Sequence, residues 1–307
     1  MRCSSTECSA LSRISPHKGG HTNVYVGILT APFGGESLDH VAAFAGEYGF
    51  GGMEVIAGPG SKHINLTDFT PGKAAAIKEL MESRALEISS VAAYTNNTDA
   101  DPARRAANNE TVKKAVDAAA LLGVEVVCTL AGMPVPGKSK MQTIEEDCAA
   151  VFTPLVEYAA QKGVKIALEN WYATNIQHLG HWQRLFEVVP NANFGLNFDP
   201  SHLAWQDIDY IGAVDKFASR IFHTHAKDTE IVEARKAWVG NQHDGGWWRY
   251  VIPGLGVIRW GEYIAALRRN GYTGVLSIEH EDGAVGREEG FLIGKKYLEQ
   301  FFVPGMS

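Results

Sequence analysis

The sequence is poor in cysteine, and its cysteines form no recognisable metal or disulfide pattern. Only four occur in 307 residues, and no two of them make a C-x-x-C pair; they are Cys3, Cys8, Cys128 and Cys148. This spacing does not favour a small disulfide-stapled scaffold or a zinc site built from thiolates. We therefore predict reduced thiols in a cytoplasmic protein.

Long apolar runs and clusters of basic residues are missing too. No stretch approaches the roughly 18 apolar residues of a membrane helix, so we predict a soluble protein without a membrane partner. Asp and Glu number 35 against 28 Lys and Arg, which gives a formal net charge of −7. Because nucleic-acid binding depends on clustered Lys and Arg, this composition argues against a nucleic-acid partner.

The first 22 residues lack the apolar core of about 7 to 15 residues that a secretion signal needs. They are polar and rich in serine instead. We predict that residues 1–22 form a disordered leader and that residues 23–303 form a single folded domain.

From residue 24 onward the chain repeats a short β-branched run, a loop and a stretch of helical periodicity. We predict eight strands, with the sequences VYVGIL, GMEVIA, EISSVAAY, VEVVCTL, VKIALEN, NFGLNFD, RIFHTHA and GVLSIEH. We predict helices over residues 38–48, 72–84, 102–122, 143–162, 177–189, 260–270 and 287–302. Eight β/α units in about 280 residues predict an α/β fold, a closed (β/α)8 TIM barrel. A doubly wound open sheet is less favoured, because no G-x-G-x-x-G follows the first strand.

The last four predicted strands end in carboxylates and imidazoles. The residues at these ends are Glu169, Asp199, His202, His223, His225, Lys227, Asp228, Glu279 and His280. In a TIM barrel the carboxyl ends of the strands share one rim, where the active site lies. Clustered carboxylates repel one another unless a cation lies among them. A rim ion pair or a buried hydrogen-bonded imidazole explains any one residue, but four consecutive strands with the same feature favour a divalent metal ion.

An oxygen-rich set of ligands with one imidazole suits hard or borderline cations. We predict Mn²⁺ as the cofactor, with Mg²⁺, Co²⁺ and Zn²⁺ as alternatives.

The combination of IALEN, NFDPSHL, HTHAKD and LSIEHED resembles the xylose isomerase-like barrels, which include sugar phosphate isomerases and epimerases, over residues 24–302. The resemblance implies one divalent ion held by Glu169, Asp199, His225 and Glu279, with the two glutamates as the proton-transfer pair. It also implies that His202 contacts the substrate at the catalytic centre. The segments NFDPSHLAWQ and SIEHED are most similar to the branch that acts on 3-keto-glycosides and related keto-sugars by elimination or hydration.

A related family of trinuclear-zinc endonucleases carries a D-R-H motif after the seventh strand. Here Trp248 and Tyr250 stand at its Asp and His positions, so two zinc ligands are missing and a DNA-repair nuclease is not favoured. Arg249 remains, and it is predicted either to bind the substrate or to form a salt bridge within the loop.

Residues 229–259 are long for a barrel loop and include Trp238, Trp247, Trp248 and Tyr250. We predict a lid whose aromatic rings stack on a sugar, although a contact in a homo-oligomer explains the tryptophans nearly as well. The predicted substrate-binding residues are His63, Lys227, Trp248 and Arg249.

The chemistry expected of this site begins with removal of the proton α to a keto-sugar carbonyl, through a metal-stabilised enediolate. Return of the proton by Glu169 or Glu279 gives an isomerase or epimerase. Loss of a β leaving group from the same enolate gives a lyase or hydratase acting on 3-keto-glycosides or related sugars. A noncatalytic sugar-binding protein is the third possibility, and in each case the partner is a small-molecule sugar.

Overall fold

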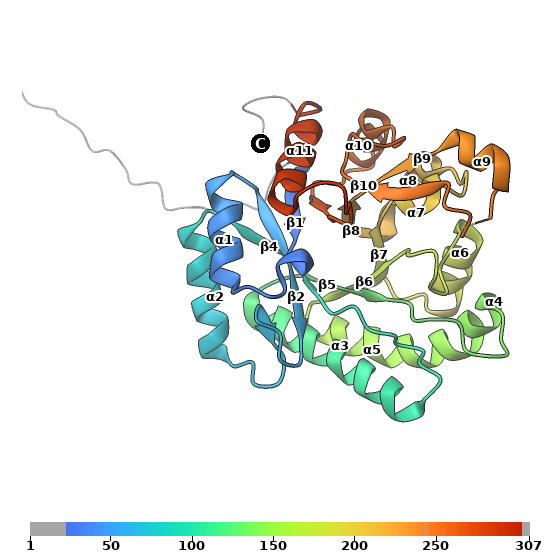
Figure 1. The fold of residues 1–307 in the computed structure, drawn as a ribbon. Coiled ribbons are helices and arrows are strands. Elements are labelled where there is room, and N and C mark those ends of the chain that lie inside the picture. Colours follow the sequence, from blue (N-terminus) through green and yellow to red (C-terminus); the bar gives the residue numbers. More distant parts are fainter. Residues whose placement is uncertain (1–22, 243, 303–307) are drawn as a thin grey trace, which may run out of the picture.

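Eight parallel strands close into a barrel in the computed structural model, which describes residues 23–242 and 244–302 (Figure 1). The predicted leader, residues 1–22, and residue 303 lie outside the described residues. Around the barrel the strands follow the order β1, β11, β8, β7, β6, β5, β4 and β2, and β2 pairs with β1 to close the ring. Their bounds are β1 Tyr25–Leu29, β2 Gly52–Gly58, β4 Glu87–Ala92, β5 Val126–Leu130, β6 Lys165–Glu169, β7 Phe194–Phe198, β8 Ile221–Ala226 and β11 Val275–Ile278. All eight predicted strands, and the predicted single-domain TIM barrel, are confirmed.

Helices surround the barrel (Figure 1). The main ones are α1 Leu38–Glu47, α2 Pro71–Ser83, α3 Pro102–Leu122, α5 Ala149–Gln161, α6 Leu179–Val188, α8 Tyr210–Phe217, α10 Trp260–Arg269 and α11 Arg287–Glu299. The predicted helix over residues 143–162 consists of α4 (Lys140–Thr143), a π-helical turn (Ile144–Cys148) and α5. Sequence reasoning did not predict α8. Among the described residues, no helix combines the length and the apolar character needed to cross a bilayer.

Local sequence signals account for the ends of α3. The side chain of Asp101 accepts hydrogen bonds from the backbone N–H groups of Ala103 and Arg104, and Pro102 occupies the first turn, where its missing N–H costs no helical hydrogen bond. The helix ends at Gly123, whose φ of 75° is in the left-handed region that glycine adopts without a steric penalty.

The two-residue period of a strand decides which side chains enter the barrel. In β6, Ile166 and Leu168 pack in the main core between the barrel and the helices, whereas Ala167 belongs to a small cluster inside the barrel. Glu169 follows Ala167 by two residues and therefore also points inward. The same alternation points Asn197, in β7, and Asp199, directly after it, inward.

The predicted lid contains regular structure. Strand β9 (Asp228–Ile231) pairs antiparallel with β10 (Trp248–Val251), and the short helix α9 (Glu233–Val239) lies between them in the chain (Figure 1). Asp228 anchors this segment, because its Oδ1 accepts from the backbone N–H of Ile258 and its Oδ2 accepts from Gly254 N and Trp260 Nε1, at 2.8 to 3.0 Å. Asp228 is therefore a structural residue of the lid rather than a side chain facing the rim site.

Candidate metal centre and active site

Four side chains from consecutive strands converge at the carboxyl end of the barrel. Glu169, Asp199, His225 and Glu279 each offer one ligand atom, and these atoms all lie within 4.8 Å of one another. The first three residues are buried and Glu279 is partly exposed. The structure thus brings together the four residues that the resemblance implies.

Two buried atoms of this group, Asp199 Oδ2 and His225 Nδ1, make no hydrogen bond of acceptable geometry, although Lys227 Nζ lies 3.3 Å from the first and Glu279 Oε2 lies 3.0 Å from the second. Buried polar atoms in native proteins almost always have a partner, so such orphan atoms need an explanation. A divalent cation among the four side chains would accept a lone pair from each of them, and three carboxylates with one imidazole are a donor set that suits Mn²⁺ or Zn²⁺. The residues present therefore fit a metal ion.

The orientation of His225 is set from behind by Glu54, in β2. His225 Nε2 lies 2.9 Å from Glu54 Oε2, while His225 Nδ1 faces Glu279 Oε2 at 3.0 Å. Burial alone would raise the pKa of Glu54, but the imidazoles of His225 and His223 lower it to about 2. An ionised Glu54 accepts a hydrogen bond from Nε2–H and so favours the tautomer that leaves the Nδ1 lone pair free for a metal ion.

Sequence reasoning missed Glu54 and its neighbour Tyr94, whose hydroxyl donates to the same carboxylate. The available signal was a single glutamate in the middle of the apolar strand GMEVIA, where an unpaired charge would be costly.

A second buried group of possible ligands comprises Glu54, Cys128 and His223. Both nitrogens of His223 are already engaged, Nδ1 with Asn197 Oδ1 at 2.9 Å and Nε2 with Ser89 Oγ at 3.0 Å, and Glu54 contacts His225. This group therefore supports the rim site from inside the barrel.

Lys227 is fully buried beside the four candidate ligands. Its Nζ lies 2.7 Å from Glu279 Oε2, 3.0 Å from Glu281 Oε2 and 3.3 Å from Asp199 Oδ2. Burial alone would lower the pKa of Lys227, but these carboxylates hold it well above its usual value. Lys227 is therefore an ammonium ion that offsets part of the negative charge of the site.

A cavity of about 220 Å³ opens directly onto this group. It is lined by Tyr94, Leu130, Glu169, Trp171, His202, Lys227, Glu279 and Glu281. Three predicted site residues from different strand ends, Glu169, Lys227 and Glu279, thus share one cavity with His202. His202 Nε2 lies 3.1 Å from Glu169 Oε1.

The three tryptophans of the predicted aromatic lid lie in different surroundings. Trp248 stacks on Trp205, with ring centroids 4.4 Å apart and an interplanar angle of 3°, and its edge meets Tyr172. Trp247 is buried. Trp238 is 85% exposed on α9. Trp248 is therefore part of an aromatic wall near His202, although it is not among the residues that line the cavity.

Arg249 and His63 do not line this cavity. Arg249 binds Glu230 and, through Nη1, Asp282 Oδ1 at 2.7 Å, which is the loop salt bridge that the sequence left open. His63 is buried at the ends of β1 and β2, where its Nδ1 lies 2.9 Å from Thr30 Oγ1. Their predicted roles in substrate binding find no support in these contacts.

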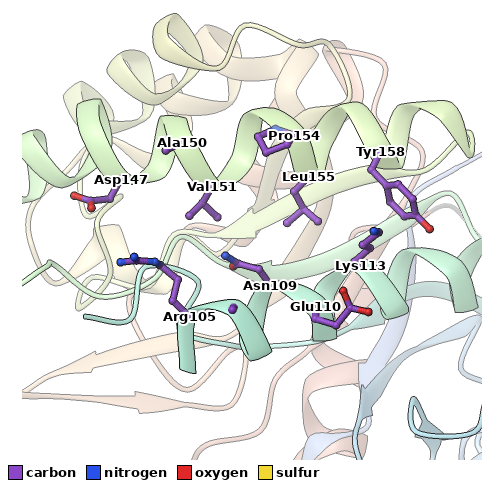
Figure 2. A pocket seen from close by; sticks show the side chains of 11 residues that line it. Arg105, Asn109, Glu110, Lys113, Asp147, Ala150, Val151, Pro154, Leu155 and Tyr158 are labelled. Atoms are coloured by element: carbon purple, nitrogen blue, oxygen red, sulfur yellow. The ribbon is translucent and has the colours of Figure 1, made fainter. Parts of the chain in front are cut away.

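A groove of about 560 Å³ on the outside of the barrel offers a competing location for a site. Figure 2 shows Arg105, Asn109 and Lys113 of α3 facing Val151 and Leu155 of α5 across it. Its charged lining residues are Arg105, Glu110, Lys113 and Asp147, the last of which pairs with Lys138, and no histidine lines it. The chemistry therefore favours the smaller cavity at the strand ends.

Comparisons with known proteins agree with the fold. The family model described as "Xylose isomerase-like TIM barrel" matches residues 42–301. An L-ribulose 3-epimerase of Methylomonas sp. (strain DH-1) is 26% identical over 257 residues, which are 78% of this chain and 82% of the relative. An inosose dehydratase of Geobacillus thermodenitrificans is 29% identical over 154 residues, 48% of this chain and about half (51%) of the relative. A crystal structure of the IOLI protein with a bound zinc atom superimposes with a TM-score of 0.70 at 20% identity and covers 91% of this chain and 99% of that one.

Proposed function

The chain belongs to the xylose isomerase-like TIM barrel family, and on this premise we propose that it is a divalent-metal-dependent isomerase or epimerase of a keto-sugar. The observation that carries the proposal is the convergence of Glu169, Asp199, His225 and Glu279 at one strand-end rim, where two buried atoms, Asp199 Oδ2 and His225 Nδ1, make no hydrogen bond. The zinc atom named for the IOLI protein supports a bound metal ion. The L-ribulose 3-epimerase supports sugar proton transfer.

A divalent ion held by these four residues would act as a Lewis acid toward a sugar carbonyl and its neighbouring hydroxyl. The protein supplies the acid and the base. Glu169 and Glu279 both line the cavity, so one carboxylate can remove the proton α to the carbonyl and the other can return one. His202 Nε2 contacts Glu169 Oε1 at 3.1 Å and so restricts the direction in which that carboxylate points.

The charge of the cavity indicates the class of sugar. Its lining contains the carboxylates of Glu169, Glu279 and Glu281 and the single ammonium of Lys227, which already pairs with Glu279, Glu281 and Asp199. With the carboxylate of Asp199 and a bound divalent ion counted as well, four carboxylates face three positive charges, and the lining has no cation left over to pair with a phosphate or carboxylate group of a sugar. We therefore propose an uncharged keto-sugar as the substrate.

A screen of uncharged keto-sugars in D₂O, followed by NMR with metal-loaded protein, tests the proposal. The expected result is deuterium at the carbon next to the carbonyl in an isomerised or epimerised product. Binding without turnover or isotope uptake across the panel would instead favour the noncatalytic sugar-binding alternative.

A second candidate is β-elimination or hydration, and the position of Lys227 favours it. The ammonium group lies 2.7 Å from Glu279, so a proton donor stands beside a candidate base within one cavity. Such a donor could protonate a departing hydroxyl or alkoxide after the α proton is lost. The similarity to an inosose dehydratase supports this route. In the same NMR experiment elimination would appear as a new double bond and a released alcohol or water, and Lys227→Gln would suppress that release while leaving α-proton exchange. Hydration, the reverse reaction, would consume the double bond of an unsaturated keto-sugar and add water across it.

A further inference from the structure

Tyr250 connects the hairpin of β9 and β10 to the candidate base. Its hydroxyl lies 2.5 Å from His202 Nδ1, and the two rings meet edge to face with centroids 5.1 Å apart. The other ring nitrogen, His202 Nε2, lies 3.1 Å from Glu169 Oε1. One hydrogen-bonded chain therefore runs from Tyr250 through His202 to Glu169.

The direction of this chain follows from its two ends. His202 Nε2 faces two carboxylates, Glu169 Oε1 at 3.1 Å and Asp199 Oδ2 at 3.4 Å. Ionised carboxylates only accept hydrogen bonds, so Nε2 must carry a proton. In a neutral imidazole Nδ1 is then the acceptor, and the phenol of Tyr250 is the donor.

The surroundings hold Tyr250 in place for this contact. Its backbone pairs with that of Thr229 in the hairpin. Asp228, at the start of the hairpin, accepts four hydrogen bonds, which come from Thr229, Gly254, Ile258 and Trp260 and hold the hairpin to the segment that follows it. The ammonium of Lys227 lies 4.5 Å from the centre of the Tyr250 ring, and the ring of Trp248 lies at 5.0 Å. The hydroxyl is therefore presented to His202 by a fixed element.

We propose that Tyr250 is a positioning residue of this active site, whose O–H holds His202 in the Nε2–H tautomer so that His202 donates to Glu169. The tautomer follows from the contacts alone; its effect on turnover rests on the proposed function. In the opposite tautomer an Nε2 lone pair would face Glu169 and Asp199, and Glu169 would lose the donor that aligns it.

Tyr250→Phe removes the hydroxyl and keeps the ring. The matched control is Tyr263→Phe, which removes a buried phenol hydroxyl of α10 that contacts the backbone oxygen of Phe198. Long-range ¹H–¹⁵N spectra of zinc-saturated protein labelled at histidine report the protonated nitrogen of each ring, and His202→Gln identifies the His202 signals.

The expected result is an unprotonated Nδ1 on His202 in the wild type and in Tyr263→Phe, and a mixed or reversed tautomer in Tyr250→Phe. A protonated Nδ1 in the wild type would overturn the proposal whether or not the variant folds. An unchanged Nδ1 signal in folded Tyr250→Phe would overturn it as well.

Kinetics give a second reading that separates the two proposals. With a keto-sugar substrate, Tyr250→Phe should lower kcat about 10-fold with little change in KM, as expected when a group that orients a reacting side chain is lost, and Tyr263→Phe should leave both values unchanged. An unchanged kcat in Tyr250→Phe would contradict the positioning role. If no keto-sugar is turned over, the proposed function fails, while the histidine spectra still decide the role of Tyr250.

Discussion

Glu54 Oε2 lies 2.9 Å from His225 Nε2, so a fully buried carboxylate of β2 supports a candidate metal ligand of β8 inside the barrel. The same carboxylate also accepts from Ser277 Oγ at 3.0 Å and from the hydroxyl of Tyr94. A carboxylate behind a histidine ligand fixes the ring and raises its basicity toward a metal ion. The metal affinity of the site should therefore depend on a residue that does not touch the ion.

Replacing Glu54 by Gln tests that dependence. The amide keeps the volume of the side chain but lacks the negative charge, so we expect the affinity for Mn²⁺ or Zn²⁺ to fall about 10- to 100-fold. Titration calorimetry or competition with a chelating dye measures it. The control is Glu87→Gln, at the start of β4, where the carboxylate contacts Tyr25 instead. Equal affinities in the two variants would show that Glu54 does not support the metal site.

Asp199→Asn tests the ligand set directly. The substitution is nearly isosteric, and Lys227 keeps its ion pairs with Glu279 and Glu281 when the charge of Asp199 is removed, so the barrel should remain intact while metal occupancy falls well below one ion per chain. Elemental analysis after dialysis and far-UV circular dichroism report the two quantities. The exposed residue Asp39 provides the control variant, Asp39→Asn. If Asp199→Asn kept its ion, Asp199 would not be a ligand.

The salt bridge of Arg249 predicts a structural effect rather than an effect on substrate binding. Arg249→Gln leaves the buried carboxylate of Asp282 without its cationic partner. Because Arg249 itself is half exposed, we expect a loss of only about 1 kcal/mol in the free energy of unfolding, together with faster proteolysis between β9 and β10. Arg184→Gln, which removes surface ion pairs on α6, is the control. A large rise in KM with unchanged proteolysis would instead restore Arg249 as a substrate contact.

His181, on α6, predicts a dependence of stability on pH. Burial, together with the charges of His178 and Lys140, lowers the pKa of His181 to about 4. The ordinary value in an unfolded chain is about 6.5, so the unfolded state binds the proton more readily between these values. The contribution of His181 is therefore fully present above about pH 6.5 and is lost as the pH falls toward 4.

Urea unfolding at pH 7, 5.5 and 4.5 measures this effect. The free energy of unfolding should fall less steeply with decreasing pH in His181→Gln than in the wild type, while the exposed variant His40→Gln should follow the wild type. Parallel curves for His181→Gln and the wild type would remove His181 as a source of the pH dependence.

The barrel and its rim could be predicted because both depend on local patterns. The β-branched runs and the glycines that end helices mark the eight β/α units, and the two-residue period of a strand places Glu169 and Asp199 on the inner side. Strand ends of a barrel share one rim, so sequence order alone brings these side chains near Glu279.

The rest of the site depends on contacts between residues far apart in the chain. Glu54 and His225 are separated by 171 positions, and nothing in the strand GMEVIA says which imidazole its carboxylate meets. Asp228 resembles a rim residue in the sequence but turns to bind the backbone of Gly254 and Ile258. Arg249 does not line the cavity and pairs with Asp282 instead. This partner comes from the loop after β11, so the local sequence around Arg249 could not predict the pair.

The most direct test of the central claim is the rate at which the α proton of an uncharged keto-sugar exchanges with solvent, measured by NMR in D₂O before and after the metal is removed. We expect about one divalent ion per chain in the purified protein, loss of exchange after exhaustive chelation, and recovery on addition of Mn²⁺. Glu169→Gln or Glu279→Gln, whichever removes the base, should slow exchange on the order of 10²-fold with metal bound. Exchange that continues at the wild-type rate in the metal-free protein, or in both Gln variants, would contradict the account.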